Sequence, residues 1–364
     1  MQHTPHPGRR RLLAAALAWP VGLYGPGPAA AQEPAAAAPA GPAATWPDVD
    51  ASGWSRDGLR AVDELARGLG SSALLVVHRG RPVHAWGAID QPLPVYSVRK
   101  SVLGVLIGMA QARGEIRLDT TLATLDINDR EGLSAQERQA TVQHLLQSRS
   151  GVYHRAAYET ADMARERPAR ASHAPGTHWY YNNWDFNALG TIFRRSTGVD
   201  AFQALERDLA LPLQFQDFDR SRHTRWHHEQ ASEHGAYLMD LSARDLARVG
   251  LLMARDGHWA GRPLVPAGWV AQSVQPWSIV EPGWQAYGYL WWVPQKAWPF
   301  WSRQPGNFFF ASGNHGQFVW VDRASDLVVV HRAQARWWRN PIVGVQLSPV
   351  LQHLLQAMPA TAPA

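Results

Sequence analysis

Short apolar runs near both ends of the chain enclose a long middle segment with a different pattern. Residues 73–77 and 82–86 are apolar runs, and Arg79-Gly80 between them is typical of a hairpin turn. Four further runs of this kind occur late in the chain, at 287–293, 308–311, 317–321 and 327–332. Strands from both ends that flank a helical middle predict one sheet built from both halves of the chain, with an inserted helical region.

Apolar residues at helical spacing predict the helices. One helix is expected at 57–69, before the first strand, and a long one opens at Ser97. The second is apolar on most of its faces, so we expect it to be buried. Further helices are expected at four places: from Thr141 to Ser150-Gly151, over 185–196 up to Gly198, from Ser242, and over 342–356. The segment from about 114 to 270 is therefore predicted to be mostly helical and rich in loops.

The N-terminal segment is predicted to be an export signal. Residues 1–31 contain three consecutive arginines, an apolar stretch too short to span a bilayer, and three alanines before Gln32. The paired arginines also permit twin-arginine export. Residues 32–50 are rich in alanine and proline and are expected to be a disordered linker, which leaves 51–358 as the folded domain. We therefore expect a periplasmic or secreted protein without a membrane span in its mature chain.

Charge and composition exclude several classes of function. Residues 1–31 carry three arginines and no acidic residue, so without them the formal charge falls from +5 to +2. This balance does not indicate binding to nucleic acid or to an anionic membrane. The chain has no cysteine, which excludes disulfides, thiol catalysis and a cysteine-built metal site. His223, His227, His228 and His234 lie close together in sequence but lack the zinc-protease pattern, so neither a metal nor another cofactor is expected.

The first candidate chemistry depends on a rare residue type. Of 35 basic residues, all but Lys100 and Lys296 are arginines. Lysine differs from arginine because, once buried, it can give up its proton near neutral pH. Ser97 and Lys100 have the spacing i, i+3, which places both side chains on one face of a helix. Lys100 is therefore a candidate base for a nucleophilic Ser97; the alternative is a capping serine beside a lysine that extends to solvent.

Two later segments add polar groups of the same kind. Residues 175–183 contain a Pro-Gly turn and the sequence Tyr181-Asn182-Asn183, where a tyrosine could relay a proton and Asn183 could bind a substrate carbonyl. Residues 311–317 place two glycines, Gly313 and Gly316, within a strand pattern. Glycine weakens a strand unless something must approach its backbone closely, and a substrate along the sheet edge would be such a reason. The structural alternative for residues 175–183 is aromatic packing, and that for residues 311–317 is a hairpin turn.

The three segments, in this order, resemble the serine β-lactamase and penicillin-binding-protein superfamily. The resemblance is strongest to its class C-like serine hydrolases, which include esterases and 6-aminohexanoate-dimer hydrolases, and it extends from about residue 56 to 333. It implies an α/β (α+β) fold with a central antiparallel sheet and a second, mainly helical region. It also implies that Ser97 is the nucleophile, Lys100 its base and Tyr181 a second proton-transfer group. The backbone N–H groups of Ser97 and Gly316 would form the oxyanion hole, and Asn183 would orient the substrate.

The third segment departs from the pattern of that superfamily. β-Lactamases and penicillin-binding proteins carry a Lys-Thr-Gly type of triplet, and the matching positions here are taken as Gly313-Asn314-His315. No cation is present to hold a substrate carboxylate, which weakens the β-lactamase and peptidase hypotheses. Asn314 and His315 are expected to contact the substrate. The sequence therefore favours a hydrolase of a small-molecule carboxylic ester or amide; the alternatives are a β-lactamase, a D-Ala-D-Ala peptidase, or a non-catalytic binding or sensor module.

Two further features have less specific explanations. Tryptophans gather at Trp291-Trp292, Trp298 and Trp301, which fits either an aromatic wall around an apolar acyl or aryl group or simple core filling. Ser101 and Ser150 are rival nucleophiles, but neither has a base at helical spacing, so a structural role is expected for both.

Overall fold

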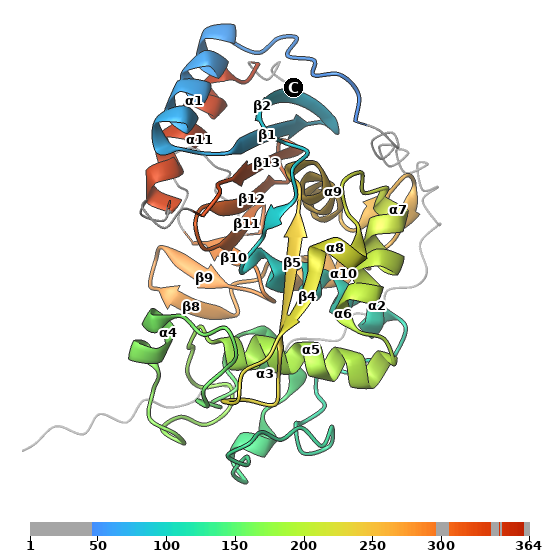
Figure 1. Ribbon diagram of the computed structural model, residues 1–364, viewed down its shortest axis with the longest axis vertical. Coiled ribbons are helices and arrows are strands. Elements are labelled where there is room, and N and C mark those ends of the chain that lie inside the picture. Colours follow the sequence, from blue (N-terminus) through green and yellow to red (C-terminus); the bar gives the residue numbers. More distant parts are fainter. Residues whose placement is uncertain (1–45, 296–305, 336–341, 343, 360–364) are drawn as a thin grey trace, which may run out of the picture. The chain divides into compact units, whose positions relative to one another are not determined.

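An eight-stranded antiparallel sheet forms the central layer of the computed structural model (Figure 1). The structure describes residues 46–295, 306–335, 342 and 344–359, so the predicted signal segment and residues 32–45 of the predicted linker lie outside the described residues. The strands, in the order in which they lie side by side, are β2 (Arg81–Gly87), β1 (Ala73–His78), β13 (Leu327–Arg332), β12 (Gln317–Asp322), β11 (Phe308–Gly313), β10 (Trp292–Pro294), β9 (Gln285–Tyr287) and β8 (Ser278–Glu281). The predicted sheet built from both ends of the chain is thus confirmed.

Helices cover both faces of this sheet. The longer ones are α1 (Arg56–Leu69), α2 (Val98–Ala112), α5 (Asn183–Thr197), α9 (Ala243–Ala254) and α11 (Ser348–Ala357). The shorter ones are α3 (Val142–Leu146), α4 (Ala161–Glu166), α6 (Ala201–Ala204), α7 (Leu211–Leu213), α8 (Arg220–His223) and α10 (Ala267–Ser273), together with the turns Glu137–Gln139, Leu205–Ala210 and Gly344–Leu347. Figure 1 shows α1 and α11 together at one end of the molecule and α5 at the other.

Alternating side chains of the strands divide between two hydrophobic cores. In β1, Leu75 and Val77 belong to the core that contains α2, α5 and α9, whereas Leu74 and Val76 face the core beneath α1 and α11. This follows from the two-residue period of a strand. A glycine, Gly250, allows α9 to approach the sheet, because a Cβ atom there would lie 2.6 Å from a methyl group of Val328.

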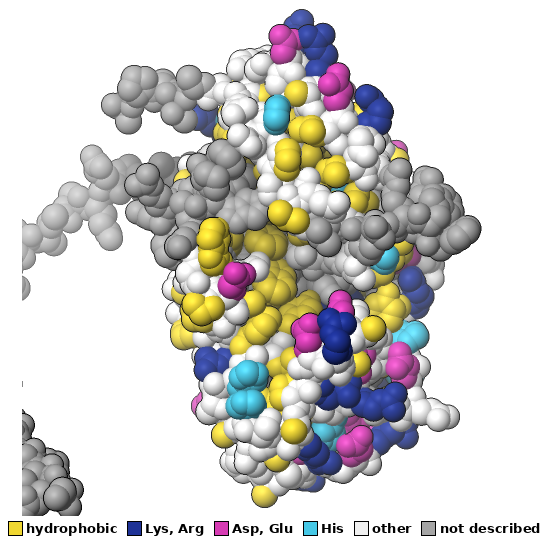
Figure 2. Space-filling view, turned by 90° about the vertical axis from the view of Figure 1, so that its left-hand side faces the viewer, with side chains coloured by type: hydrophobic (Ala, Val, Ile, Leu, Met, Phe, Trp, Pro, Cys, Tyr) yellow, Lys and Arg dark blue, Asp and Glu magenta, His cyan; other side chains and the backbone are white. Residues whose placement is uncertain are grey.

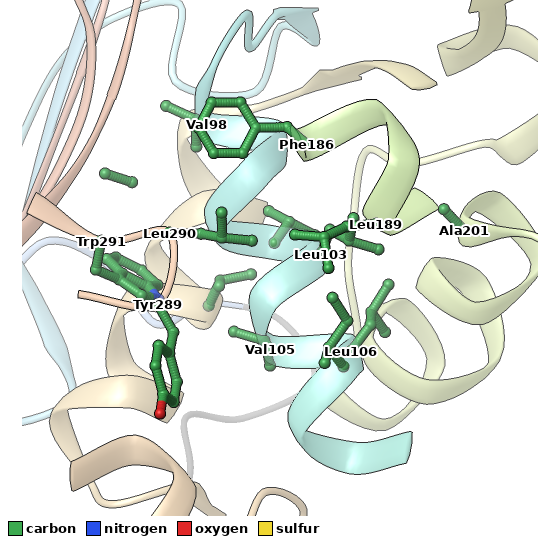
Figure 3. Close-up of a cluster of buried hydrophobic side chains, with 14 of the residues drawn as sticks. Val98, Leu103, Val105, Leu106, Phe186, Leu189, Ala201, Tyr289, Leu290 and Trp291 are labelled. Atoms are coloured by element: carbon green, nitrogen blue, oxygen red, sulfur yellow. The ribbon is translucent and has the colours of Figure 1, made fainter. Parts of the chain in front are cut away.

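Helix α2 lies at the centre of the larger core. Figure 3 shows Val98, Leu103, Val105 and Leu106 of this helix among side chains of α5 and of residues 289–291. All residues of α2 from Val98 to Ala110 are buried, as its apolar composition predicted. The buried position fixes the first turn of the helix, where Ser97 and Lys100 lie.

The middle of the chain is less helical than predicted. A second antiparallel sheet has the order β3 (Leu93–Pro94), β5 (Ala236–Leu241), β4 (Thr224–His227). The run in β5 is too short for its apolar pattern to separate a strand from a helix. Pairing on both edges decides the outcome: β5 pairs with β4 over four residues and with β3, about 145 residues earlier in the sequence, over two. Sequence periodicity does not reveal either pairing.

Four other predicted boundaries differ from the structure. The predicted strand 287–293 is two strands, β9 and β10, joined by a turn in which Leu290 has a φ of +65°. The helix after Thr141 ends at Leu146, before the predicted Ser150-Gly151. The last helix starts at Ser348, after a 3-10 turn. Trp46, within the predicted disordered linker, packs against the core and donates a hydrogen bond from its indole to the carbonyl of Arg244.

Candidate active site

Ser97 is the residue that directly precedes α2, and its hydroxyl does not cap the helix. It adopts helical φ and ψ angles of −73° and −10°, and no backbone N–H of the first turn donates to its side chain. The capping explanation of this serine is therefore wrong. Tyr96 before it has a φ of +48°, a conformation that non-glycine residues rarely adopt and that is concentrated at functional sites. This backbone turn presents the Ser97 side chain at the surface of a cleft.

Arg332 anchors the segment that leads into Ser97. Its guanidinium is buried and donates to the carbonyl oxygens of Leu93 and Pro94 on β3, at 2.8 and 3.2 Å, and to that of Leu241 on β5. Its Nε donates to Gln317 on β12 at 2.7 Å. One side chain of the central sheet thus fixes the position of the second sheet and of the loop that carries Ser97. No local sequence pattern distinguishes Arg332, because its backbone partners on β3 and β5 are distant in sequence.

Lys100 lies in an apolar environment and is hydrogen-bonded to Tyr181. Its side chain is 1% exposed, and Nζ donates to Tyr181 Oη at 2.8 Å. Nζ also lies 4.1 Å from the centroid of the Tyr181 ring and 4.2 Å from that of Phe186. Burial, together with the nearby positive charge of Arg99, lowers the pKa of Lys100 well below its ordinary value. The environment therefore favours the neutral amine that a base requires.

Arg99 is a second buried cation beside Lys100. Its guanidinium carbon lies 4.6 Å from the centroid of the Tyr237 ring, and its Nε and Nη1 atoms have no hydrogen-bond partner among the described residues. Its burial, which no local pattern distinguishes, makes it part of the electrostatics of the site.

Tyr181 is held in place by the start of α5 and by a set of aromatic rings. Asn182 caps α5 by accepting from the backbone N–H of Asp185, which fixes the residue before it. The Tyr181 ring lies 5.3 Å from Trp292 and 5.8 Å from Tyr287, measured between ring centroids. Burial raises the pKa of Tyr181 to about 12, and an interaction with the Ser97 hydroxyl opposes this rise. Tyr181 is thus a neutral phenol that contacts both Ser97 and Lys100.

These groups lie at a cleft of about 400 Å³. Its lining combines the first turn of α2, the end of β11 and the region of α4. The described lining residues are Ser97, Thr160, Asp162, Met163, Glu166, Tyr181, Trp292, Ser312, Gly313, Asn314, Phe318, Ile342 and Gly344. Asp162 and Glu166 are its charged members, and both are paired with Arg165, at 2.7 and 3.2 Å. Among these residues the cleft contains no arginine or lysine.

Gly313, and not Gly316, is the glycine that the Ser97 segment approaches. A Cβ atom on Gly313 would lie 2.3 Å from the carbonyl oxygen of Val95 and 3.1 Å from the backbone nitrogen of Ser97. Gly316 packs against Ile342 and Ala333 instead, and it is absent from the cleft lining described above. The triplet that ends in the packed glycine is therefore Ala311-Ser312-Gly313, two residues before the predicted match. Alanine is the first residue of this triplet, so the corrected match also lacks the lysine that β-lactamases and penicillin-binding proteins have at that position.

The three predicted substrate-contacting residues have different environments. Asn314 is exposed and lines the cleft. His315 lies outside the lining and packs its ring 5.0 Å from that of Tyr96, so it contacts the loop before Ser97. Asn183 is buried, and its amide donates to the carbonyl of Tyr158. The structure thus brings Asn314 to the cleft, whereas Asn183 holds the loop behind it.

Both rival serines have structural partners. Ser101 donates to the carbonyl of Leu290 at 2.6 Å. Ser150 donates to the buried carboxyl of Asp185, whose pKa burial raises to about 7. Asp185 was not singled out in the sequence, and it joins the loop after α3 to the first turn of α5.

The predicted histidine-rich loop has separate hydrogen-bond partners. His227 pairs with Glu229 at 2.9 Å, and His234 with Thr191 at 3.0 Å. Within the described ranges, no group of three or more histidine or acidic side chains is arranged to hold a metal ion. The described helices are also each too short or too polar to cross a membrane.

Comparison with known proteins identifies the family. A family model described as Beta-lactamase matches residues 57–334. Comparison with curated protein sequences finds no match. Among solved structures, a candidate 6-aminohexanoate-dimer hydrolase from Bacillus anthracis is 20% identical, with a TM-score of 0.62 over 88% of this chain and 89% of its own.

Two further solved structures are similar at about the same level. A penicillin-binding protein homologue from Caulobacter crescentus is 16% identical, with a TM-score of 0.61 over 84% of this chain and 99% of its own. EstCE1, a hydrolase with promiscuous acyltransferase activity, is 15% identical, with a TM-score of 0.60 over 84% and 98%. At these identities the likeness shows the fold. The match of the family model over most of the sequence shows that the chain belongs to the beta-lactamase family, within the serine β-lactamase and penicillin-binding-protein superfamily.

Proposed function

We propose that the protein is a serine hydrolase that cleaves a carboxylic ester or a small amide through an acyl-enzyme on Ser97. The observation that carries this proposal is the buried Lys100, whose Nζ lies 2.8 Å from Tyr181 Oη. The adjacent Ser97 has a hydroxyl that does not cap the helix. Burial of a lysine costs stability, and buried groups with strongly shifted pKa values are concentrated at functional sites. A neutral amine next to a phenol and a serine hydroxyl is a set of groups suited to nucleophilic catalysis.

In the proposed reaction, protons move along these three side chains. Ser97 Oγ attacks the substrate carbonyl while its proton passes to Tyr181 Oη and the phenol proton passes to Lys100 Nζ. The bond from the carbonyl carbon to the leaving oxygen or nitrogen then breaks, and the leaving group takes the proton back through Tyr181. A water molecule attacks the acyl-enzyme by the same route, which releases the carboxylic acid and restores Ser97.

The negative charge on the carbonyl oxygen needs hydrogen-bond donors. We assign this role to the backbone N–H groups of Ser97 and Asn314, in place of the predicted Ser97 and Gly316. Asn314 follows Gly313, whose backbone packs against the Ser97 nitrogen, and it lines the cleft. Removal of one such donor typically costs about 100- to 1,000-fold in kcat.

The charges at the cleft support an ester or a small amide over a β-lactam. A penicillin or a D-Ala-D-Ala peptide carries a carboxylate, and the described lining offers no lysine or arginine to hold it. Its two carboxylates, Asp162 and Glu166, are paired with Arg165 and supply no positive charge. The similar structures include a candidate 6-aminohexanoate-dimer hydrolase and a hydrolase with promiscuous acyltransferase activity, alongside a penicillin-binding protein homologue.

Labelling with a fluorophosphonate probe, followed by peptide mass analysis, tests the proposal. We expect an adduct on Ser97 that disappears in Ser97→Ala. Ser101→Ala is the matched control, because it removes a hydroxyl from the next turn of the same helix. No adduct would favour the non-catalytic binding module instead, and an adduct on another serine would overturn the assignment of Ser97 as the nucleophile. Faster turnover of a chromogenic cephalosporin than of p-nitrophenyl esters would favour a β-lactamase.

A further inference from the structure

A second cavity of about 350 Å³ adjoins the catalytic cleft. Trp292, Ser312, Phe318 and Gly344 line both, so the two spaces share a wall. The second cavity extends away from Ser97 along the face of the sheet that bears Phe308 and Phe310. Figure 2 shows hydrophobic side chains gathered on the side of the molecule that carries β8, β9 and α4.

The described lining of this cavity is aromatic and uncharged. The ring of Trp292 is parallel to that of Phe310, with an interplanar angle of 13°, and Phe318 and Trp320 stack at 4.9 Å. Ser312 and Gln285 are the polar members of the described lining. An apolar cavity of about 150 Å³ takes up benzene, so this cavity has room for a larger group such as a phenylethyl or hexyl chain.

The cavity opens to solvent beside an apolar side chain. Val345, which lines it, is 73% exposed. An aromatic cavity with an apolar opening is typical of a site for an apolar ligand.

The geometry assigns the cavity to one side of the scissile bond. Tyr181, which returns the proton to the leaving group in the proposed reaction, packs 5.3 Å from Trp292, and Trp292 forms the wall between cleft and cavity. We propose that this cavity binds the apolar part of the leaving alcohol or amine, so that the substrates are esters or amides of medium-chain alkyl or arylalkyl alcohols or amines. This inference rests on the proposed hydrolase function.

Two series of esters separate the two sides of the bond. In the first, acetates of ethanol, butanol, hexanol and 2-phenylethanol vary only the alcohol. In the second, ethyl esters of acetic, butyric and hexanoic acid vary only the acyl group. We expect kcat/KM, which reports acylation, to rise in the first series by up to about fourfold per methylene until the cavity is filled. The second series should change much less.

Gly344→Leu tests the cavity directly. Its Cβ position has no heavy atom closer than 3.6 Å, from the Phe318 ring, so a side chain can be accommodated and would occupy the shared space. We expect the ratio of kcat/KM for hexyl acetate over ethyl acetate to fall at least tenfold. Val345→Asp, at an exposed position that does not threaten folding, should lower the same ratio. Gly268→Leu, on α10 in open space, is the matched control and should leave the ratio unchanged.

Calorimetric titration with 2-phenylethanol provides a readout that does not depend on turnover. We expect binding to the wild-type protein and at least tenfold weaker binding to Gly344→Leu. Ester hydrolysis that responds to acyl length, or that ignores the alcohol, would overturn the assignment of the cavity and leave the hydrolase proposal standing. Absence of 2-phenylethanol binding would also overturn it. Binding at the cavity without hydrolysis of any ester or small amide would overturn the proposed function and, with it, the leaving-group role of the cavity, while the apolar binding site itself would stand.

Discussion

Replacement of Lys100 by arginine separates the role of a base from the role of a positive charge. Both side chains are cations in water, but arginine does not give up its proton in proteins. At a position that is 1% exposed, with Nζ 2.8 Å from Tyr181 Oη, the neutral amine is the form that can accept a proton from the phenol. Lys100→Arg therefore keeps the charge and removes the base.

The size of the expected loss follows from this geometry. Proton transfer by a positioned side chain contributes about 100- to 10,000-fold to the rate. This corresponds to about 2.7–5.5 kcal/mol of transition-state stabilisation. Lys100 Nζ lies 4.1 and 4.2 Å from the ring centroids of Tyr181 and Phe186. The larger guanidinium of Lys100→Arg therefore also overpacks the site, which costs about 1–3 kcal/mol in stability. Lys100→Met, which lacks the charge but is close in size, should lose a similar fraction of activity without that overpacking.

Hydrolysis of p-nitrophenyl acetate and the rate of fluorophosphonate labelling at Ser97 measure the effect. Urea unfolding of each variant checks that it is folded. We expect kcat/KM to fall at least 100-fold in Lys100→Arg and in Lys100→Met. If Lys100→Arg stays within tenfold of the wild type while Lys100→Met is inactive, a positive charge is what the site needs, and the argument from a neutral lysine is refuted.

Three further predictions concern the groups around Lys100. Tyr181→Phe keeps the ring contacts and removes the hydroxyl, so kcat/KM should fall by about 100- to 10,000-fold with little change in melting temperature. A decrease in kcat/KM of less than tenfold would exclude a proton relay through the phenol. Gly313→Ala should lower both ester turnover and the urea midpoint, because its Cβ atom would lie 2.3 Å from the carbonyl oxygen of Val95; unchanged values of both would contradict the close approach. Burial raises the pKa of Asp185 to about 7 in the folded state, against 3.8 for an ordinary aspartate. Between these two pH values the folded state binds more protons than the unfolded state, so the free energy of unfolding falls as the pH rises from about 4 to about 7. Asp185→Asn should remove this part of the pH dependence, which urea unfolding of both proteins across that range measures; identical pH profiles would show that Asp185 does not titrate there.

Local pattern was sufficient for elements whose neighbours in sequence are also their neighbours in space. The hairpin at Arg79-Gly80 formed as predicted, with φ angles of +51° and +77° that suit a tight turn between twisted strands. Helix α5 ends at Gly198 in the left-handed conformation, as the glycine indicated. Strand β5 was missed because a mostly apolar run of six residues does not separate a strand from a helix, and its pairing partners, β4 and the distant β3, are set by the tertiary fold.

The candidate site divides in the same way. Ser97 and Lys100 share the first turn of one helix, so their proximity follows from helical geometry alone. Tyr181 was selected by motif and resemblance, and its 2.8 Å contact with Lys100 belongs to the packing of α5 against α2. The choice between Gly313 and Gly316 could not be made from sequence, because both are glycines in one strand pattern and only the distance to the Ser97 backbone separates them.

The sequence by itself determined which residue types are available for chemistry: no cysteine, two lysines, and a serine one helical turn before one of those lysines. It also determined the periodicity that buries α2, since burial of an apolar helix is favourable in any arrangement of its neighbours. Tertiary structure alone decided the environment of Lys100, the glycine beside Ser97, the role of Arg332 and the aromatic cavity behind Trp292. Each of these depends on contacts between segments distant in the chain, and such contacts set the desolvation that shifts the pKa of Lys100 and the shape of the space that receives the substrate.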